Sequence, residues 1–136
     1  METILDKMQI DLDGLFRTIK HPLVILDKDD NIVTSNDDAE FFFGLSRNIL
    51  NKYKFTALYN KTSPLYYLIN QSREKKTTIR EYSLMLKNIV DKKEHEVDIQ
   101  VSPFEDTDYL LLMFIERGIA KKFNRQYMQA GSAKSL

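Results

Sequence analysis

Three strand-like segments in the C-terminal half of the chain constrain its fold more than any other feature. Residues 78–86 and 95–101 alternate apolar and polar side chains, whereas residues 109–115 are almost entirely apolar. Alternation predicts a strand with one face on a core, and a continuous apolar run predicts a central strand covered on both faces. Polar connections of a few residues join the three segments, as is typical of antiparallel neighbours. We therefore expect an antiparallel sheet with residues 109–115 at its centre.

Two shorter apolar segments near the N-terminus add a second pair of strands. Residues 23–26 and 32–35 flank Asp27-Lys28-Asp29-Asp30-Asn31, whose Asx side chains can bond to their own backbone and favour a turn. This arrangement predicts a β-hairpin. The acidic residues here and at Asp37 and Asp38 also suggest a cation site, but their spacing lacks the glycine and distal glutamate of a calcium loop. We interpret them as turn and capping residues.

Capping residues predict helices between the two groups of strands. Asn36 or Asp37 is suited to cap a short helix over residues 38–43, which a glycine follows. Ser63 precedes a proline that fits the first helical turn, and apolar spacing continues that helix to about Glu74. The order of all segments predicts an α+β fold: a five-stranded antiparallel sheet with short helices on one face, flanked by N- and C-terminal helices.

Amphipathic segments lie on both sides of the predicted domain, residues 21–116. Apolar residues recur at spacings of three and four within residues 1–20, which predicts a helix. Residues 117–136 begin as a second helix and end in small polar residues typical of a linker to a further domain. The apolar stripes of the two helices comprise Leu5, Met8, Leu12, Leu15, Ile19, Ile119, Phe123 and Tyr127. These residues either pack on their own domain or form dimer and signalling helices, and the spacing favours neither interpretation.

Several short stretches carry a resemblance to a known family. In chain order they are His21-Pro22-Leu23-Val24, Asn36, Ala39-Glu40-Phe41-Phe42, Ser63-Pro64-Leu65, Glu81-Tyr82, Val97-Asp98-Ile99-Gln100-Val101-Ser102-Pro103, Glu116-Arg117-Gly118-Ile119-Ala120, Arg125-Gln126 and Ser132-Ala133-Lys134-Ser135-Leu136. Together with the order of strands and helices, this set resembles the N-terminal PAS domains of the NtrB family of nitrogen-regulation sensor histidine kinases. The resemblance extends from about residue 13 to the C-terminus.

The resemblance implies a sensory and dimerisation module of a cytoplasmic two-component kinase, which relays a packing change through its C-terminal helix. The implied partners are a second copy, the rest of the kinase and, indirectly, a response regulator and a PII-type signal protein. In the family, a histidine beyond the linker accepts phosphate from ATP, so the parent protein would use ATP and Mg²⁺. This chain stops before that histidine and lacks the ATP-binding domain, so we do not expect it to be an enzyme itself.

Aromatic side chains are the candidates for a ligand site. Pockets for small molecules are lined mainly by apolar and aromatic groups. The candidate cavity residues are Phe41, Phe42, Phe55, Tyr59, Tyr66 and Tyr82. The same residues can also fill an ordinary core, and this is the interpretation we favour. The alternative is a small-molecule sensor with a ligand in the core.

The sequence disfavours metals and the cofactors of related sensors. It contains no cysteine, which removes thiolate metal ligands and flavin–cysteinyl chemistry. His21 and His95 are its two histidines, and neither has a second histidine four residues away. Haem-binding PAS domains place a histidine on the central helix, here residues 63–74, where this chain has none. We expect no bound metal, haem or flavin.

Charge and hydropathy limit the partners. Twenty basic and twenty acidic residues cancel, whereas nucleic-acid binding requires an excess of Lys and Arg. No apolar run approaches the roughly 20 residues that span a bilayer. The N-terminus is acidic and interrupted by polar residues, unlike a signal peptide. We expect a cytoplasmic protein that binds neither nucleic acid nor membrane.

Overall fold

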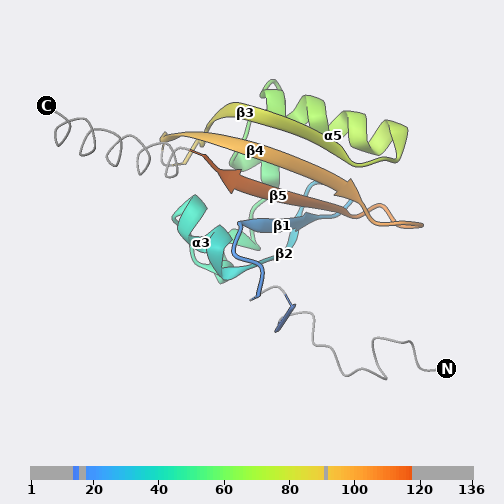
Figure 1. Cartoon of the computed structure of the whole chain (residues 1–136). Helices are drawn as coiled ribbons and strands as arrows, with labels where there is room; N and C mark the ends of the chain where they lie inside the picture. Colours follow the sequence, from blue (N-terminus) through green and yellow to red (C-terminus); the bar gives the residue numbers. More distant parts are fainter. Residues whose placement is uncertain (1–13, 16–17, 91, 118–136) are drawn as a thin grey trace, which may run out of the picture.

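A computed structural model describes residues 14–15, 18–90 and 92–117 of the chain (Figure 1). The predicted strands and helices between residues 23 and 116 are present in the predicted order. The elements are β1 (Leu23–Leu26), β2 (Ile32–Ser35), α3 (Asp37–Phe43), α4 (Arg47–Leu50), the 3₁₀ helix η1 (Phe55–Ala57), α5 (Pro64–Lys75), β3 (Ile79–Lys87), β4 (Glu94–Pro103) and β5 (Leu110–Glu116).

The five strands form one antiparallel sheet in the order β2-β1-β5-β4-β3. The apolar strand β5 is therefore central, as its composition predicts, and β2 and β3 are the edges. Helix α5 packs on β3 and β4, and α3 and α4 pack on β1 and β2. Figure 1 shows these helices beside opposite halves of the sheet. The predicted α+β architecture of a five-stranded antiparallel sheet with helices is confirmed, whereas the predicted flanking helices in residues 1–20 and 117–136 lie mostly outside the described residues.

The hydrophobic core lies between the helices and one face of the sheet, called here the inner face. Residues that pair across neighbouring strands share a face, so Val24, Leu112 and Val101 point inward together. All three are fully buried. Each residue one position along points to the opposite, outer face, which includes Ile25, Met113 and Gln100.

The helix boundaries follow from their caps. Asn36 is the N-cap of α3 and its side chain accepts a hydrogen bond from the Ala39 N–H. Gly44 ends α3 with a φ of 70°, a left-handed conformation that glycine adopts without steric cost. Ser63 caps α5 by accepting from the Leu65 N–H, with a proline in the first turn. The predictions for these caps are confirmed.

One prediction about β3 is wrong. Strict alternation would place Tyr82, Leu84 and Leu86 on one face, but the register with β4 shifts between Glu81 and Leu84. Ser83 has a φ of 56° at this β-bulge, and the extra residue sends Tyr82 to the face opposite Leu84 and Leu86. Tyr82 is consequently 65% exposed.

Within the described ranges, the helices are all too short or too polar to cross a membrane.

Candidate functional site

An aromatic cluster occupies the middle of the core. Phe114 of β5 contacts Phe42, Phe43 and Tyr59, with ring centroids 5.1, 5.6 and 6.5 Å away. Phe55 lies 5.3 Å from Tyr59 and 6.1 Å from Tyr66. Edge-to-face and tilted arrangements at these spacings are favourable for aromatic rings. The rings thus fill the space between the sheet and the helices by contact with one another.

The structure brings together four of the six candidate cavity residues. Phe42, Phe55, Tyr59 and Tyr66 are buried in the aromatic cluster. Tyr82 lies outside it because of the β3 bulge. Phe41 is 87% exposed, because a helix as short as α3 cannot turn three successive side chains inward. These two residues are therefore not part of the core.

Two members of the cluster, Phe43 and Phe114, are absent from the set predicted from sequence. Phe43 shares a face of α3 with the buried Ala39, a spacing of four that the sequence already displays. Phe114 alternates with Leu112 and Leu110 on the inner face of β5. In a strand that is apolar on both faces, alternation cannot be recognised, which explains why Phe114 was missed.

A half-buried polar network connects the β1–β2 turn to helix α5. One Arg73 guanidinium nitrogen, Nη1, lies 2.7 Å from Oδ1 of Asp30, and Nη2 donates to the Asp27 carbonyl at 2.7 Å. Asp30 holds a left-handed φ of 65°, and its own carbonyl accepts from the Phe55 N–H at 2.7 Å. Burial, with a smaller contribution from the nearby Asp30 carboxylate, raises the pKa of the Tyr66 hydroxyl well above its ordinary value. The network therefore links the turn, α5 and the aromatic cluster.

The raised pKa of Tyr66 predicts a loss of stability at alkaline pH. An exposed Tyr in the unfolded chain loses its proton near pH 10, as expected for a pKa of about 10. The folded chain holds the Tyr66 proton at higher pH, so its stability is intact below pH 10 and falls as pH rises further. Urea unfolding between pH 8 and 11 should show a shallower decline for Tyr66→Phe than for wild type. Tyr67→Phe, at a 66% exposed position on the same helix, should behave like wild type; equal declines in all three proteins would contradict the prediction.

The acidic residues of the β1–β2 hairpin act as turn residues. The Asp27 carboxylate accepts from the backbone N–H groups of Asp29 and Asn31 and from the Asn31 side chain. The Asn31 side chain is the main reason that the pKa of Asp27 lies below its usual value. Among the described residues, no group of three or more His, Cys, Asp or Glu side chains is arranged to hold a metal ion.

The two histidines lie in different surroundings. His21 is exposed at the start of β1, and its carbonyl accepts from the Asn36 side chain. His95 points inward from β4, with its ring 4.6 Å from that of Phe42. Its strand β4 lies inside the sheet between β5 and β3.

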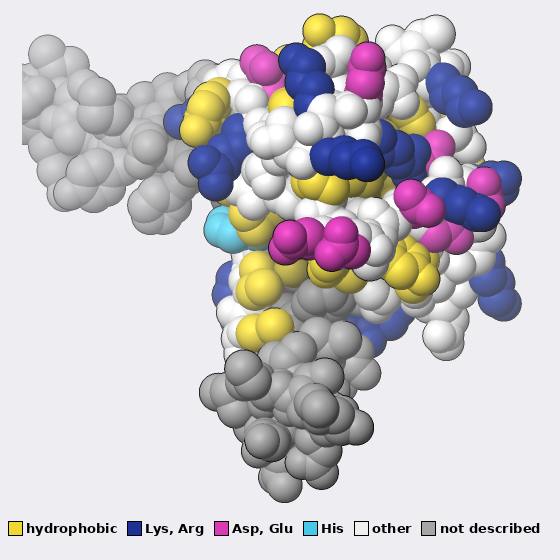
Figure 2. Space-filling model, turned by 90° about the vertical axis from the view of Figure 1, so that its right-hand side faces the viewer, with side chains coloured by type: hydrophobic (Ala, Val, Ile, Leu, Met, Phe, Trp, Pro, Cys, Tyr) yellow, Lys and Arg dark blue, Asp and Glu magenta, His cyan; other side chains and the backbone are white. Residues whose placement is uncertain are grey.

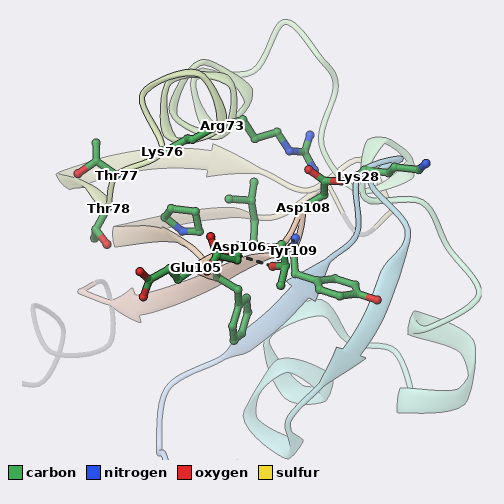
Figure 3. A pocket seen from close by; sticks show the side chains of 13 residues that line it. Lys28, Arg73, Lys76, Thr77, Thr78, Glu105, Asp106, Asp108 and Tyr109 are labelled. Atoms are coloured by element: carbon green, nitrogen blue, oxygen red, sulfur yellow. Dashed lines mark hydrogen bonds between the residues drawn. The ribbon is translucent and has the colours of Figure 1, made fainter.

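A surface pocket of about 770 Å³ lies between the end of α5, the β1–β2 turn and the β4–β5 turn (Figure 3). Its walls carry Lys28, Arg73 and Lys76 as well as Glu105 and Asp106. Figure 2 views the molecule from this side and shows basic, acidic and apolar side chains interspersed. The pocket is separate from the aromatic cluster and presents no surface of one charge sign.

The outer face of the sheet is apolar over its central strands. Leu23 and Ile25 of β1 lie there beside Leu111 and Met113 of β5, with which they pair, and Ile115 continues the row. Leu23 is buried, while the other four are half-buried. We call these five residues the outer stripe. The outer positions of β4 are polar instead, so the stripe is confined to β1 and β5.

Asn36 attaches the N-terminal segment to the domain beside the outer stripe. Its Oδ1 accepts from the N–H groups of Leu23 and Ala39 at 2.9 and 3.0 Å. Its Nδ2 donates to the carbonyls of His21 and Ile19 at 2.7 and 3.3 Å. Asn36 is 1% exposed, so one buried amide orients the chain from residue 19 into β1.

The candidate helix residues are described only in part. Leu15 is 45% exposed and Ile19 is half-buried. The others, Leu5, Met8, Leu12, Ile119, Phe123 and Tyr127, lie outside the described residues. At the C-terminal end, the Arg117 N–H donates to the Glu96 carbonyl at 2.9 Å and extends the pairing of β5 with β4 by one residue. Both flanking segments therefore start from the central strands β1 and β5.

Comparisons with known proteins agree with this architecture. The chain is 30% identical to the sensory histidine kinase/phosphatase NtrB of Rhizobium meliloti over 124 residues, which are 90% of this chain and 32% of that protein. It is 27% identical to NtrB of Rhizobium leguminosarum bv. phaseoli, with the same coverage. The chain thus spans about a third of the length of these curated relatives. The predicted resemblance to the NtrB family is confirmed.

Solved structures share the fold. The PAS domain of nitrogen regulation protein NR(II) from Vibrio parahaemolyticus superimposes with a TM-score of 0.66 at 20% identity, covering 79% of this chain and 99% of that one. A LOV protein from Rhodobacter sphaeroides gives a TM-score of 0.65 at 14% identity, covering 87% and 69%. A model of the PAS fold matches residues 10–118. By this match and by its strand order, the chain belongs to the PAS family.

Proposed function

We propose that this chain is the sensory and dimerisation module of a cytoplasmic two-component histidine kinase that controls nitrogen regulation. The similarity to NtrB over 90% of the chain supports this parent. In this proposal the module relays a packing change through the segment that follows β5. The remainder of the parent binds ATP and Mg²⁺ and transfers phosphate to a response regulator, and a PII-type protein delivers the nitrogen signal. The module itself needs no cofactor and binds neither nucleic acid nor membrane.

The outer stripe is the observation that carries the dimerisation proposal. It places five apolar side chains on the two strands from which the flanking segments start. Ile19, the last apolar position of the pattern in residues 1–20, has its carbonyl bonded to the Asn36 side chain, which also accepts from the N–H of Leu23 in the outer stripe. A second copy that contributes the same stripe and helix would cover this apolar surface symmetrically.

The central position of β5 supports the relay. Phe114 points into the aromatic cluster, while its neighbours Met113 and Ile115 belong to the outer stripe. A shift of the aromatic rings would therefore move the strand that forms the proposed interface and continues into residues 117–136. Such a relay requires two packing states that a signal populates differently.

A charge in the outer stripe should weaken the dimer. Met113→Glu places a carboxylate in the proposed interface, and a buried unpaired charge costs several kcal/mol, so the dimer dissociation constant should rise at least about tenfold. Sedimentation equilibrium of the 136-residue chain measures this constant.

Phe41→Glu is the matched control, since it introduces the same charge at an exposed apolar position on α3. It should leave the dissociation constant unchanged. Circular dichroism should show both variants folded. A wild-type chain that remains monomeric at millimolar concentration, or a Met113→Glu variant that dimerises like wild type, would contradict the proposal.

A ligand in the core is the alternative function. The contacts among Phe42, Phe43, Phe55 and Phe114 fill the space that such a ligand would occupy. Binding would therefore require these rings to move apart. Native mass spectrometry of the purified chain tests this alternative: a bound small molecule of constant mass would support it over the purely structural relay.

A further inference from the structure

The carboxylate of Asp98 joins two distant segments on the outer face of the sheet. Its Oδ1 accepts a hydrogen bond from the Ser83 N–H at 2.9 Å and another from Nη1 of Arg117 at 3.2 Å. Asp98 lies on β4 and pairs with Ile115 of the outer stripe. Ser83 is on the edge strand β3, and Arg117 directly follows β5. One oxygen atom therefore contacts both sides of β4.

The Ser83 contact substitutes for a missing strand pair. The β3–β4 register shifts at this point, so the Ser83 N–H has no place in the regular ladder. Ser83 also adopts a left-handed φ of 56°, which is unfavourable for a residue with a side chain. Such a conformation persists only when surrounding contacts hold it. The hydrogen bond from the Ser83 N–H to Asp98 is one such contact at this bulge.

The Arg117 contact is at the start of the C-terminal segment. The Arg117 backbone is still bonded to β4 through Glu96, and its side chain folds back two residues along β4 to Asp98. The Asp98 side chain is 16% exposed and the Arg117 side chain is 44% exposed. With its guanidinium in place, Arg117 limits the orientations of the Asp98 carboxylate and keeps Oδ1 directed at Ser83.

We infer that Asp98 is a positioning residue that couples the strained bulge of β3 to the start of the C-terminal segment. Displacement of Arg117 frees the carboxylate to rotate toward solvent and releases the Ser83 N–H. Conversely, rearrangement of the bulge removes one of the two partners that orient the carboxylate for Arg117. This reciprocity is the thermodynamic mark of coupling between two sites. The inference deepens the proposed relay, but it concerns contacts within one copy and does not depend on dimerisation.

Amide hydrogen exchange, followed by NMR on the full 136-residue chain, tests the coupling. Arg117→Gln should accelerate exchange of the Ser83 amide by about fivefold or more. Arg80→Gln is the matched control, because Arg80 makes the neighbouring cross-strand bond to Gln100, whereas the ion-pair partner of Asp98 is Arg117. The control should leave Ser83 unchanged. Ser83 exchange that is unchanged or slower in Arg117→Gln would overturn the inference.

Two substitutions of Asp98 separate the two contacts. Asp98→Ala should accelerate exchange of both the Ser83 and the Arg117 amides. Asp98→Asn keeps an oxygen that can accept from Ser83 but loses the charge that holds Arg117, so the Arg117 amide should respond more than that of Ser83. The inference would also be overturned if Asp98→Asn left the exchange rates of both amides at their wild-type values. The same holds if Asp98→Ala left the exchange rate of the Ser83 amide unchanged. Sedimentation of the same samples reports dimerisation separately, so failure of either proposal is recognised independently.

Discussion

Replacement of Phe114 by Ala is expected to lower the free energy of unfolding by about 3–5 kcal/mol, the range for aromatic-to-Ala changes in a core. Phe114 is fully buried and contacts three other rings of the aromatic cluster. The neighbouring strands constrain β5 from both sides, so the backbone cannot collapse into the cavity that the substitution leaves. Urea denaturation monitored by circular dichroism measures the loss, which is a large fraction of the roughly 5–15 kcal/mol typical of a domain.

Phe41→Ala is the control for this prediction. It removes the same side chain from a position that is 87% exposed, so the free energy of unfolding should change by less than about 0.5 kcal/mol. If Phe114→Ala unfolds too readily for a measurement, Phe114→Leu should retain the fold with a smaller loss. A Phe114→Ala variant as stable as Phe41→Ala would show that the aromatic cluster does not stabilise the domain.

Asn36→Ala is expected to cost about 2–4 kcal/mol, because it removes a helix cap and the side-chain acceptor of the buried Leu23 N–H. The N–H groups of Leu23 and Ala39 and the carbonyl of His21 all lose a hydrogen bond to its side chain. Amide exchange at Leu23 should accelerate more than exchange in β4. The same variant should release the chain before β1 from its fixed direction.

Two further variants distinguish the cap from the attachment of the N-terminal segment. Asn36→Asp keeps both acceptor bonds but loses the Nδ2 donors to Ile19 and His21. Asn36→Asp should therefore leave the start of α3 capped, while residues 19–21 lose the hydrogen bonds that fix their position. Asn60→Ala removes an exposed bond to the Thr62 N–H and should cost less than about 1 kcal/mol. Equal losses for Asn36→Ala and Asn60→Ala would argue against the role assigned to Asn36.

Much of the fold follows from local patterns. The central position of β5 is evident from its unbroken apolar run, and the caps at Asn36 and Ser63 mark helix starts through side-chain bonds that reach only two or three residues. Because such signals act over short distances, they are visible in the sequence without the tertiary structure. The order of strands and helices together with these signals was sufficient for the PAS architecture.

The predictions that are wrong concern positions where a single residue alters the alternation or the helical spacing. The bulge at Ser83 shifts the register of β3. The residue with the left-handed φ is a serine and not a glycine, so the sequence gives no signal of the bulge. Tyr82 was consequently assigned to the core although it lies on the surface. Likewise, three successive phenylalanines do not reveal which one faces outward until the axis of α3 is known.

The sequence by itself determined the elements, their order, the family and the residues that cap the helices, because these depend on neighbours along the chain. Only the tertiary structure decided which aromatic side chains meet, that Arg73 pairs with Asp30, and that the apolar outer stripe lies on β1 and β5. It also decided that Asp98 contacts both Ser83 and Arg117. The long-range contacts among these extend from 15 positions, between Ser83 and Asp98, to 90 positions, between Leu23 and Met113. They depend on strand register and helix packing, which no local pattern specifies.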